Sequence, residues 1–182
     1  MKLEILKNEC FYHIYNRGIN SCAIFTNDDN KRFFLKKLKE HLQNTIIIYA
    51  YCLMDNHFHL AIKVLNETEV TQKFSNFFNA YAKAYNKQEN RTGSLFEKHF
   101  KRIQLKDENY LQNLIVYIHQ NPMKHLQLNF TKYSFSSYAP FLSDKETLLP
   151  REDVFNLFSD IENFKFMHLK EIENLTEFYT LE

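Results

Sequence analysis

The feature that most constrains the fold is an alternation of histidines and apolar residues in His57–Leu65. Residues two apart in a strand point to the same face of a sheet, so His57 and His59 are predicted side by side. The residues predicted on the opposite, helix-covered face are Phe58, Leu60, Ile62 and Val64. Paired imidazoles form half of a metal site that needs a third ligand from elsewhere in the chain. Histidines with this spacing also occur in strands that bind no metal.

Turn and cap signals divide the chain into strand, helix, strand, strand, helix, strand and a further helix. The predicted strands are Cys10–Asn16, Thr45–Met54, His57–Leu65 and Phe96–Leu105. Helices are predicted after the caps Asn27–Asn30 and Asn66–Thr68, and from Glu108 to about His119, before a break at Asn121–Pro122. This order predicts an α+β fold, a ferredoxin-like βαββαβ antiparallel sheet with both linking helices on one face. The histidines fall on the other face, which is free for a site.

The length and composition favour one compact unit with an appendage. The chain has 182 residues, of which 45% are hydrophobic and 25% are charged. We predict a domain of residues 1–133 followed by a C-terminal helical tail, residues 134–182, packed on or near it. In the tail, Pro150 can start a short helix and Ile161–Phe178 is acidic and amphipathic.

Several classes of protein are disfavoured by what the sequence contains. Only Gly18 and Gly93 occur, which excludes glycine-rich nucleotide-binding loops. The three cysteines lack CxxC spacing, which favours reduced thiols over disulfides or a zinc knuckle. The strongest apolar run, Thr45–Met54, is too short to span a bilayer, and the N-terminus lacks the apolar region of a signal peptide. We therefore expect a cytoplasmic protein without a membrane partner.

Charge is distributed unevenly along the chain. Residues 1–133 hold 19 Lys and Arg against 12 Asp and Glu, a balance of +7, whereas residues 134–182 hold 4 against 10, a balance of −6. A basic body can attract a polyanion such as DNA, although solvated helix faces would give the same pattern. The candidates for contacts with a DNA backbone are Arg17, Lys31, Arg32, Lys36, Lys37, Lys98, Lys101 and Arg102.

The last predicted helix carries a possible partner for the histidines. Tyr117 and Asn121 are four residues apart and therefore share one helix face. A tyrosine hydroxyl can attack phosphorus, and an amide oxygen can complete a set of metal ligands with two histidines. Spacing alone equally allows Tyr117 to pack at a helix end and Asn121 to cap it. Tyr85 and Tyr110 are rival hydroxyls, and no general base is obvious.

An ordered series of short motifs resembles the single-tyrosine HUH transposases. Its first part comprises Tyr12-His13-Ile14, Asn16-Arg17-Gly18, Ile24-Phe25, Tyr51-Cys52-Leu53-Met54 and Asn56-His57-Phe58-His59-Leu60. Its second part is similar to the REP-associated branch and comprises Gly93-Ser94-Leu95-Phe96, Tyr110-Leu111, Tyr117-Ile118-His119-Gln120-Asn121-Pro122 and Ser136-Ser137-Tyr138. The chain departs from the family at Asp55, where proline is usual, and at Phe135, where tryptophan is usual. The resemblance spans Tyr12 to about Tyr138.

The resemblance implies a metal-dependent DNA strand transferase that cuts and rejoins single-stranded DNA at hairpin-bearing repeat ends. Tyr117 would be the nucleophile that becomes joined to a DNA 5′-phosphate. His57, His59 and Asn121 would bind the divalent ion, Mg²⁺ or Mn²⁺. Residues 1–133 would form the HUH catalytic domain, with the helix of Tyr117 as its added C-terminal catalytic helix.

Two other interpretations stay open at the level of sequence. One is a sequence-specific DNA-hairpin binding protein without chemistry, and the other is a globular protein with an incidental zinc ion or no metal. The recognised hairpin, the choice between monomer and homodimer, and donation of the tyrosine within one chain or across a dimer are also open.

Overall fold

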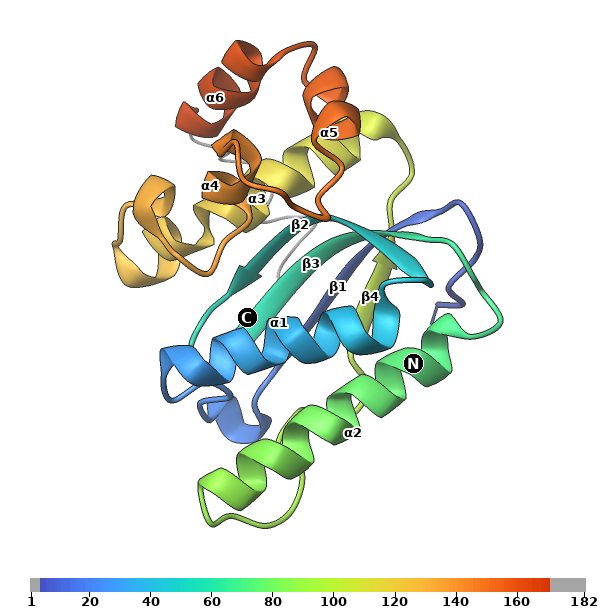
Figure 1. Ribbon diagram of the computed structural model, residues 1–182, viewed down its shortest axis with the longest axis vertical. Coiled ribbons are helices and arrows are strands. Elements are labelled where there is room, and N and C mark those ends of the chain that lie inside the picture. The colour runs from blue at the N-terminus through green and yellow to red at the C-terminus, as the bar shows by residue number, and fades with distance from the viewer. Residues whose placement is uncertain (1–3, 171–182) are drawn as a thin grey trace.

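The computed structural model describes residues 4–170. Its centre is a four-stranded antiparallel sheet in the order β2-β3-β1-β4 (Figure 1). The strands are β1 (Phe11–Arg17), β2 (Ile46–Leu53), β3 (His57–Val64) and β4 (Lys101–Gln104). This strand order is that of a βαββαβ ferredoxin-like sheet, so the predicted α+β fold is confirmed.

Two helices cover one face of the sheet, as Figure 1 shows. They are α1 (Asp28–Leu42) and α2 (Val70–Gln88). Helix α1 begins where the Asn27 side chain accepts a hydrogen bond from the Asn30 amide, 2.9 Å away. The core beneath these helices is largely aromatic and includes Phe34, Phe58, Phe74, Phe77 and Tyr81.

Helix α3 (Glu108–Leu126) covers the opposite face of the sheet and contributes to a second core. The prediction that this helix ends before Pro122 is wrong, because it continues to Leu126. Pro122 has no N–H to donate to the carbonyl of Ile118, four residues earlier, so the helix loses one hydrogen bond. The Asn121 Nδ2 donates to the neighbouring carbonyl oxygen, that of Tyr117, at 2.9 Å. Packing against the sheet holds the helix together across the interruption, and Gln127, in a left-handed conformation, ends it.

Strand β4 is shorter than the predicted Phe96–Leu105. Phe96 makes only an isolated bridge with Gly18, and His99 has a φ of +55°, which turns the chain out of the extended conformation before Lys101. The first strand is shifted by one residue from the predicted Cys10–Asn16, since it runs from Phe11 to Arg17.

The chain after α3 folds back onto that helix. This segment begins with a short 3₁₀ turn, Phe130–Lys132. A second such turn, Ile19–Ser21, lies elsewhere, after β1. Helices α4 (Tyr138–Leu142), α5 (Arg151–Leu157) and α6 (Ile161–Leu169) bury Phe141, Val154, Phe158 and Phe164 in the second core. Residues 171–178 of the predicted amphipathic stretch lie outside the described residues. Among residues 4–170, no helix combines the length and the hydropathy that crossing a bilayer requires.

A buried polar chain joins α6 to α3. His119 Nδ1 lies 2.7 Å from His168 Nε2, and His119 Nε2 lies 2.7 Å from Ser137 Oγ. His168 Nδ1 in turn donates to the Phe164 carbonyl oxygen at 2.7 Å. Both histidines are fully buried. The segment after residue 133 is thus tied to α3 by hydrogen bonds as well as by aromatic packing.

Candidate active site

His57 and His59 project from β3 toward α3, while Phe58 between them is buried under α1 and α2. The two imidazole centroids are 5.1 Å apart, and their planes make an angle of 79°. His59 is buried and His57 is half-buried. The period of two along the strand therefore brings both rings to one side, which is the arrangement that the sequence pattern predicts.

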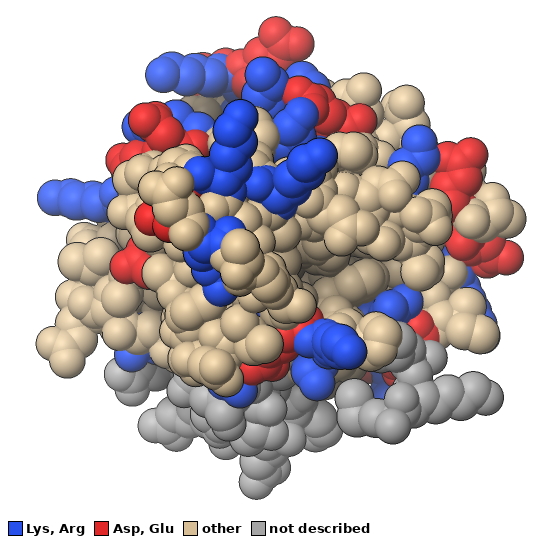
Figure 2. Space-filling view, turned by 90° about the horizontal axis from the view of Figure 1, so that it is seen from below, with Lys and Arg blue, Asp and Glu red and all other residues tan. Residues whose placement is uncertain are grey.

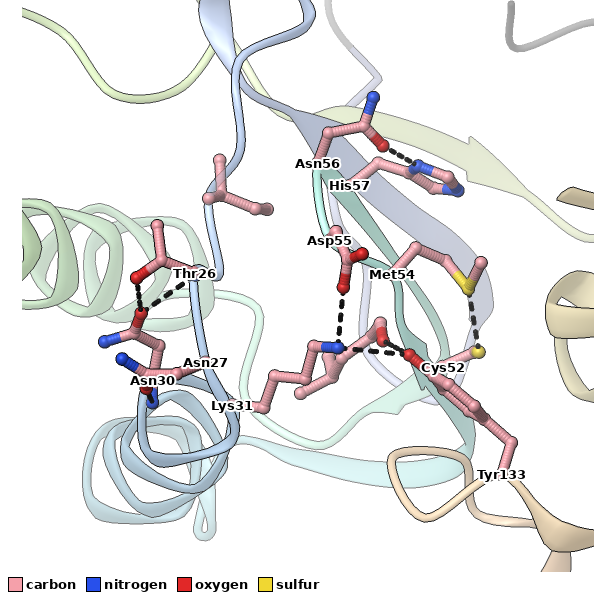
Figure 3. A network of polar contacts seen from close by, with 12 residues as sticks. Thr26, Asn27, Asn30, Lys31, Cys52, Met54, Asp55, Asn56, His57 and Tyr133 are labelled. Atoms are coloured by element: carbon pink, nitrogen blue, oxygen red, sulfur yellow. Dashed lines mark hydrogen bonds and ion pairs between the residues drawn. The ribbon is translucent and has the colours of Figure 1, made fainter. Parts of the chain in front are cut away.

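The turn before His57 is held by an ion pair, which Figure 3 shows. Lys31 Nζ extends from α1 to Asp55 Oδ1 at 2.8 Å and to the Tyr133 hydroxyl at 3.2 Å. Burial by itself lowers the pKa of Lys31, but the hydrogen bond to Asp55 and the nearby Tyr133 raise it by more, so the net shift is upward. Tyr133 then donates to the Leu53 carbonyl oxygen at 2.7 Å. The β2–β3 turn is thus fixed although it lacks a proline.

The end of β1 is anchored to the same turn. The Gly18 amide donates to the Asn56 carbonyl oxygen at 2.8 Å. A Cβ at Gly18 would lie 2.0 Å from the carbonyl oxygen of Cys22, so the loop can pass this close only because residue 18 is glycine. Arg17 and His57 are paired across the strands directly beside it.

Each histidine uses its Nδ1 for a hydrogen bond to a protein group. His57 Nδ1 lies 2.7 Å from Asn56 Oδ1, as drawn in Figure 3. His59 Nδ1 lies 3.0 Å from the Nε2 of His13, a fully buried residue on β1. In both rings Nε2 is the nitrogen that these contacts do not use.

The imidazoles of this cluster are neutral at pH 7. Burial lowers the pKa of His57 to about 4; the electrostatic interaction with nearby His125 lowers it further, and the hydrogen bond with Asn121 opposes both effects. Burial also lowers the pKa of His13 to about 3. For His59, burial and the neighbouring histidines hold the pKa well below its usual range. Neutral rings are the form that binds metal ions.

Helix α3 brings Tyr117 and Asn121 to the histidines. The Tyr117 ring centroid is 5.7 Å from that of His59, and the ring is 8% exposed. The Lys124 ammonium lies 5.2 Å from the centroid of the Tyr117 ring. Asn121 is fully buried. The four residues that the sequence resemblance singles out therefore meet in one place.

The donor set fits a divalent cation. The Asn121 Oδ1 is buried and makes no hydrogen bond of ordinary geometry within residues 4–170, although Asn121 lies close enough to His57 to raise the pKa of that ring. A buried carbonyl oxygen beside two neutral imidazoles is a combination that a metal ion would satisfy. Over the same residues, no three His, Cys, Asp or Glu side chains converge to hold a metal. An ion here would therefore depend on the amide of Asn121.

A cleft of about 970 Å³ opens over these residues. It is lined by the two histidines and Tyr117, and by Tyr15, Asn16, Arg17, Asp55, Glu97, Lys101 and His125. Arg17 Nε is paired with Glu97 Oε1 at 2.5 Å. Lys101 is the cross-strand neighbour of Tyr15, which in turn faces His59, so Lys101 shares the histidine face. A hollow of this size with cations at its rim can accommodate part of a nucleic acid strand.

The remaining predicted DNA contacts are placed differently. Lys98 is exposed but does not line the cleft, and Arg102 stacks over Phe100 at 4.3 Å on the face under α2. Lys31, predicted as a candidate contact with a DNA backbone, does not lie on the exterior, because only 9% of its side chain is exposed and the side chain is paired with Asp55. The other three candidate contacts on α1 are exposed or half-buried and pair within the helix: Arg32 with Asp28 and Asp29, and Lys36 and Lys37 with Glu40. On the face shown in Figure 2, Lys and Arg side chains lie beside a hollow with Asp and Glu among them.

The rival tyrosines are remote from the cluster. The Tyr85 hydroxyl donates to the Ala23 carbonyl oxygen at 2.9 Å, and Tyr110 packs against the second core near the start of α3. His125 lines the cleft, with its ring centroid 5.4 Å from that of His57, and was not among the predicted site residues. It lies eight residues after Tyr117, so the helical period would have placed it on the same face had the helix been extended past Pro122.

Comparison with known proteins gives a family match over most of the chain. A family model described as "Transposase IS200 like" matches residues 6–121. No curated protein matches the sequence.

Solved structures resemble the fold at low sequence identity. A structure of a REP-associated tyrosine transposase bound to a REP hairpin is 16% identical, with a TM-score of 0.60, and covers 79% of this chain and 85% of its own. A tRNA(His) guanylyltransferase from Saccharomyces cerevisiae is also 16% identical, with a TM-score of 0.48 and coverage of 100% and 84%. The first likeness concerns the fold alone, and the second is too distant to carry an argument.

Proposed function

Because this chain belongs to the family of IS200-like transposases, we propose that it is an HUH-type DNA strand transferase that cleaves and rejoins single-stranded DNA. The observation that carries the proposal is the meeting of Tyr117 with His57 and His59 in one cleft, with Asn121 buried next to His57. These side chains come from β3 and α3 of a single chain, which supports a proposal that the tyrosine acts on the site of its own chain.

In the proposed reaction the Tyr117 hydroxyl oxygen attacks the phosphorus of a DNA phosphodiester. The bond from phosphorus to the 3′-oxygen of the preceding nucleotide breaks, and that oxygen leaves with a proton as a 3′-hydroxyl. The phenol loses its proton, and the DNA 5′-phosphate becomes joined to the tyrosine. Attack by another 3′-hydroxyl on this phosphotyrosine reverses the step and rejoins a strand without a further energy source.

His57, His59 and Asn121 would hold the divalent ion, Mg²⁺ or Mn²⁺, and their neutral rings and buried amide oxygen support this assignment. When bound, the ion polarises the scissile phosphate. The histidine rings and the Tyr117 ring also form a partly buried surface that would orient the phosphate.

The substrate we propose is single-stranded DNA next to a hairpin. The similar solved structure of a REP-associated tyrosine transposase is bound to a REP hairpin, which supports the same class of partner here. Arg17 and Lys101 at the cleft are the contacts with the DNA backbone that we favour, and exposed Lys98 lies three residues before Lys101. Hairpin shape and unpaired bases would carry the specificity.

The test is the formation of a covalent protein–DNA adduct. Labelled single-stranded DNA from the repeats that flank the gene is incubated with the protein and Mn²⁺, and a denaturing gel then reveals any adduct. Tyr117→Phe removes one oxygen and little packing, so this variant should keep hairpin affinity and thermal stability but form no adduct. Tyr110→Phe, on the same helix, is the matched control and should leave adduct formation in place.

A second candidate is a DNA-hairpin binding protein without chemistry. It gains support if the parent protein binds the hairpin but yields no adduct with any flanking DNA and metal ion tried. An adduct that persists in Tyr117→Phe would instead show that another residue is the nucleophile.

A further inference from the structure

The contact between His13 and His59 is the strongest feature of the site that the proposed reaction does not use. His13 Nε2 and His59 Nδ1 are 3.0 Å apart, and the rings are stacked with centroids 5.2 Å apart and planes 26° apart. His13 is fully buried and His59 is 3% exposed, so solvent does not compete for this hydrogen bond.

The strand pairing fixes how the two rings meet. His13 on β1 is paired with Ala61 on β3, while Tyr15 is paired with His59. His13 therefore reaches His59 diagonally across the sheet, on the face that α3 covers. The cleft is lined by His59 but not by His13. His13 therefore acts on the cleft through its ring neighbours there: it is hydrogen-bonded to His59, and its ring centroid lies 6.4 Å from that of Tyr117.

A hydrogen bond between two ring nitrogens needs one N–H and one lone pair. If His13 donates, the proton of a neutral His59 sits on Nε2, and that nitrogen cannot bind a cation. If His59 donates from Nδ1, its Nε2 carries a lone pair. Only the second arrangement leaves His59 able to act as a ligand.

The other histidine of the pair has an equivalent contact. The His57 Nδ1 lies 2.7 Å from Asn56 Oδ1, and an amide oxygen only accepts. Asn56 thus holds the proton of His57 on Nδ1. The two imidazoles each have a hydrogen-bond partner on the ring nitrogen next to the backbone, from two different elements. Such outer contacts commonly orient metal-ligating histidines, and their loss commonly costs 10–100-fold in metal affinity.

We propose that His13 is a positioning residue that accepts a hydrogen bond from His59 Nδ1 and thereby holds His59 in the tautomer whose Nε2 binds a divalent cation. The proposal rests on the proposed function in one respect only, the use of His59 as a metal ligand. The competing explanation is that His13 merely fills space between the rings of Tyr15 and Tyr117, whose centroids lie 4.8 Å and 6.4 Å from its own.

Two substitutions separate the explanations. His13→Phe keeps a ring in the core but has no acceptor, whereas His13→Gln offers an amide oxygen at about the reach of Nε2. The probe is Mn²⁺ alone, titrated into the full chain without DNA and followed by calorimetry. We expect roughly 10–100-fold weaker Mn²⁺ binding for His13→Phe, partial recovery for His13→Gln, and unchanged hairpin affinity for both. Mn²⁺ binding by His13→Phe within twofold of the parent would overturn the proposal, as would equal losses in both variants.

A measurement on the parent protein removes the dependence on folded variants. Nitrogen-15 NMR of the histidine rings distinguishes a proton on Nδ1 from one on Nε2. We expect His59 to carry its proton on Nδ1, and a proton found mainly on Nε2, with diamagnetic Mg²⁺ present, would refute the assignment. Failure of the proposed function looks different: Mn²⁺ affinity would then be the same in His57→Ala as in the parent, or no adduct would form.

Discussion

Acidification should destabilise this protein through its buried histidines, and His168 gives the sharpest test. His168 is fully buried in the second core between His119 and aromatic rings. Burial lowers its pKa from about 6.5 to about 4, and the hydrogen bond to the Phe164 carbonyl opposes this shift without reversing it. Below pH 6.5 His168 is therefore protonated in the unfolded chain but remains neutral in the folded chain, until the pH approaches 4. The stability contributed by neutral His168 is complete above about pH 6.5 and is lost as the pH falls toward 4.

The magnitude follows from proton linkage. Each pKa unit corresponds to about 1.4 kcal/mol, and integration from pH 7 to pH 5 for the shift of His168 gives a loss of about 1.8 kcal/mol. Fully buried His13, with its pKa lowered by burial to about 3, adds a loss of similar size. Domains of this kind are stable by about 5–15 kcal/mol, so these two rings alone remove a considerable part of the margin.

The assay compares urea unfolding at pH 7, 6 and 5, followed by circular dichroism, in the parent and in His168→Gln. The variant should be less stable at pH 7 by roughly 1–3 kcal/mol, because His119 Nδ1 and the Phe164 carbonyl lose their present partner. Between pH 7 and pH 5, however, it should lose about 1.8 kcal/mol less than the parent.

Exposed His99 supplies the control, since His99→Asn removes a histidine that lies outside both cores. Carboxylates elsewhere affect all three proteins alike and cancel in the comparison. An equal loss of stability in parent and His168→Gln would refute the reasoning, because His168 would then not be a neutral ring that resists protonation.

Two further predictions concern the ion pair at the turn and the cleft cations. Asp55→Ala should lower the free energy of unfolding by roughly 1–3 kcal/mol in urea titrations, because the buried ammonium of Lys31 loses its carboxylate partner and keeps the hydrogen bond to the Tyr133 hydroxyl. A smaller loss in Lys31→Met,Asp55→Ala than in Asp55→Ala alone would identify the unpaired buried charge as the cause. A double variant as unstable as the single one would contradict this explanation. Lys101→Ala should reduce the slope of log affinity for the hairpin against log salt concentration by about 0.7, as measured by fluorescence anisotropy. Arg102→Ala should leave this slope unchanged, because Arg102 lies on the other face of the sheet. Equal effects of the two changes would argue against the cleft as the DNA site.

The sheet and its two faces could be predicted because they depend on local patterns. Alternation along His57–Leu65 separates the histidines from Phe58 by a period of two, and caps such as Asn27 mark where helices begin. The end of α3 could not be predicted in the same way. A proline normally stops a helix, but the packing of α3 on the sheet outweighs one missing hydrogen bond, and packing is not visible in the order of residues. His99 likewise adopts a positive φ that could not be predicted from its residue type.

In the candidate site, too, some contacts could be predicted from the sequence and others could not. Tyr117 and Asn121 share a helix face by their spacing, so their proximity to each other was readable. The burial of Lys31 was not, because its partners Asp55 and Tyr133 lie 24 and 102 residues away in the sequence. The contact of His13 with His59 spans 46 residues and depends on which strands are neighbours. Contacts of this kind follow from topology, which a local pattern does not specify.

The meeting of Tyr117 with His59 inside one chain has a consequence for inheritance. If each copy cuts with its own tyrosine, a copy that lacks Tyr117 and a copy that lacks His57 cannot repair each other by exchanging helices, so two such alleles in one cell fail to complement. On the same premise, a Tyr117→Phe copy that still bound the repeats would compete for them with intact copies. Each gene copy would then be selected on its own complete set of residues, and a lineage would keep the activity only while one copy retained them all.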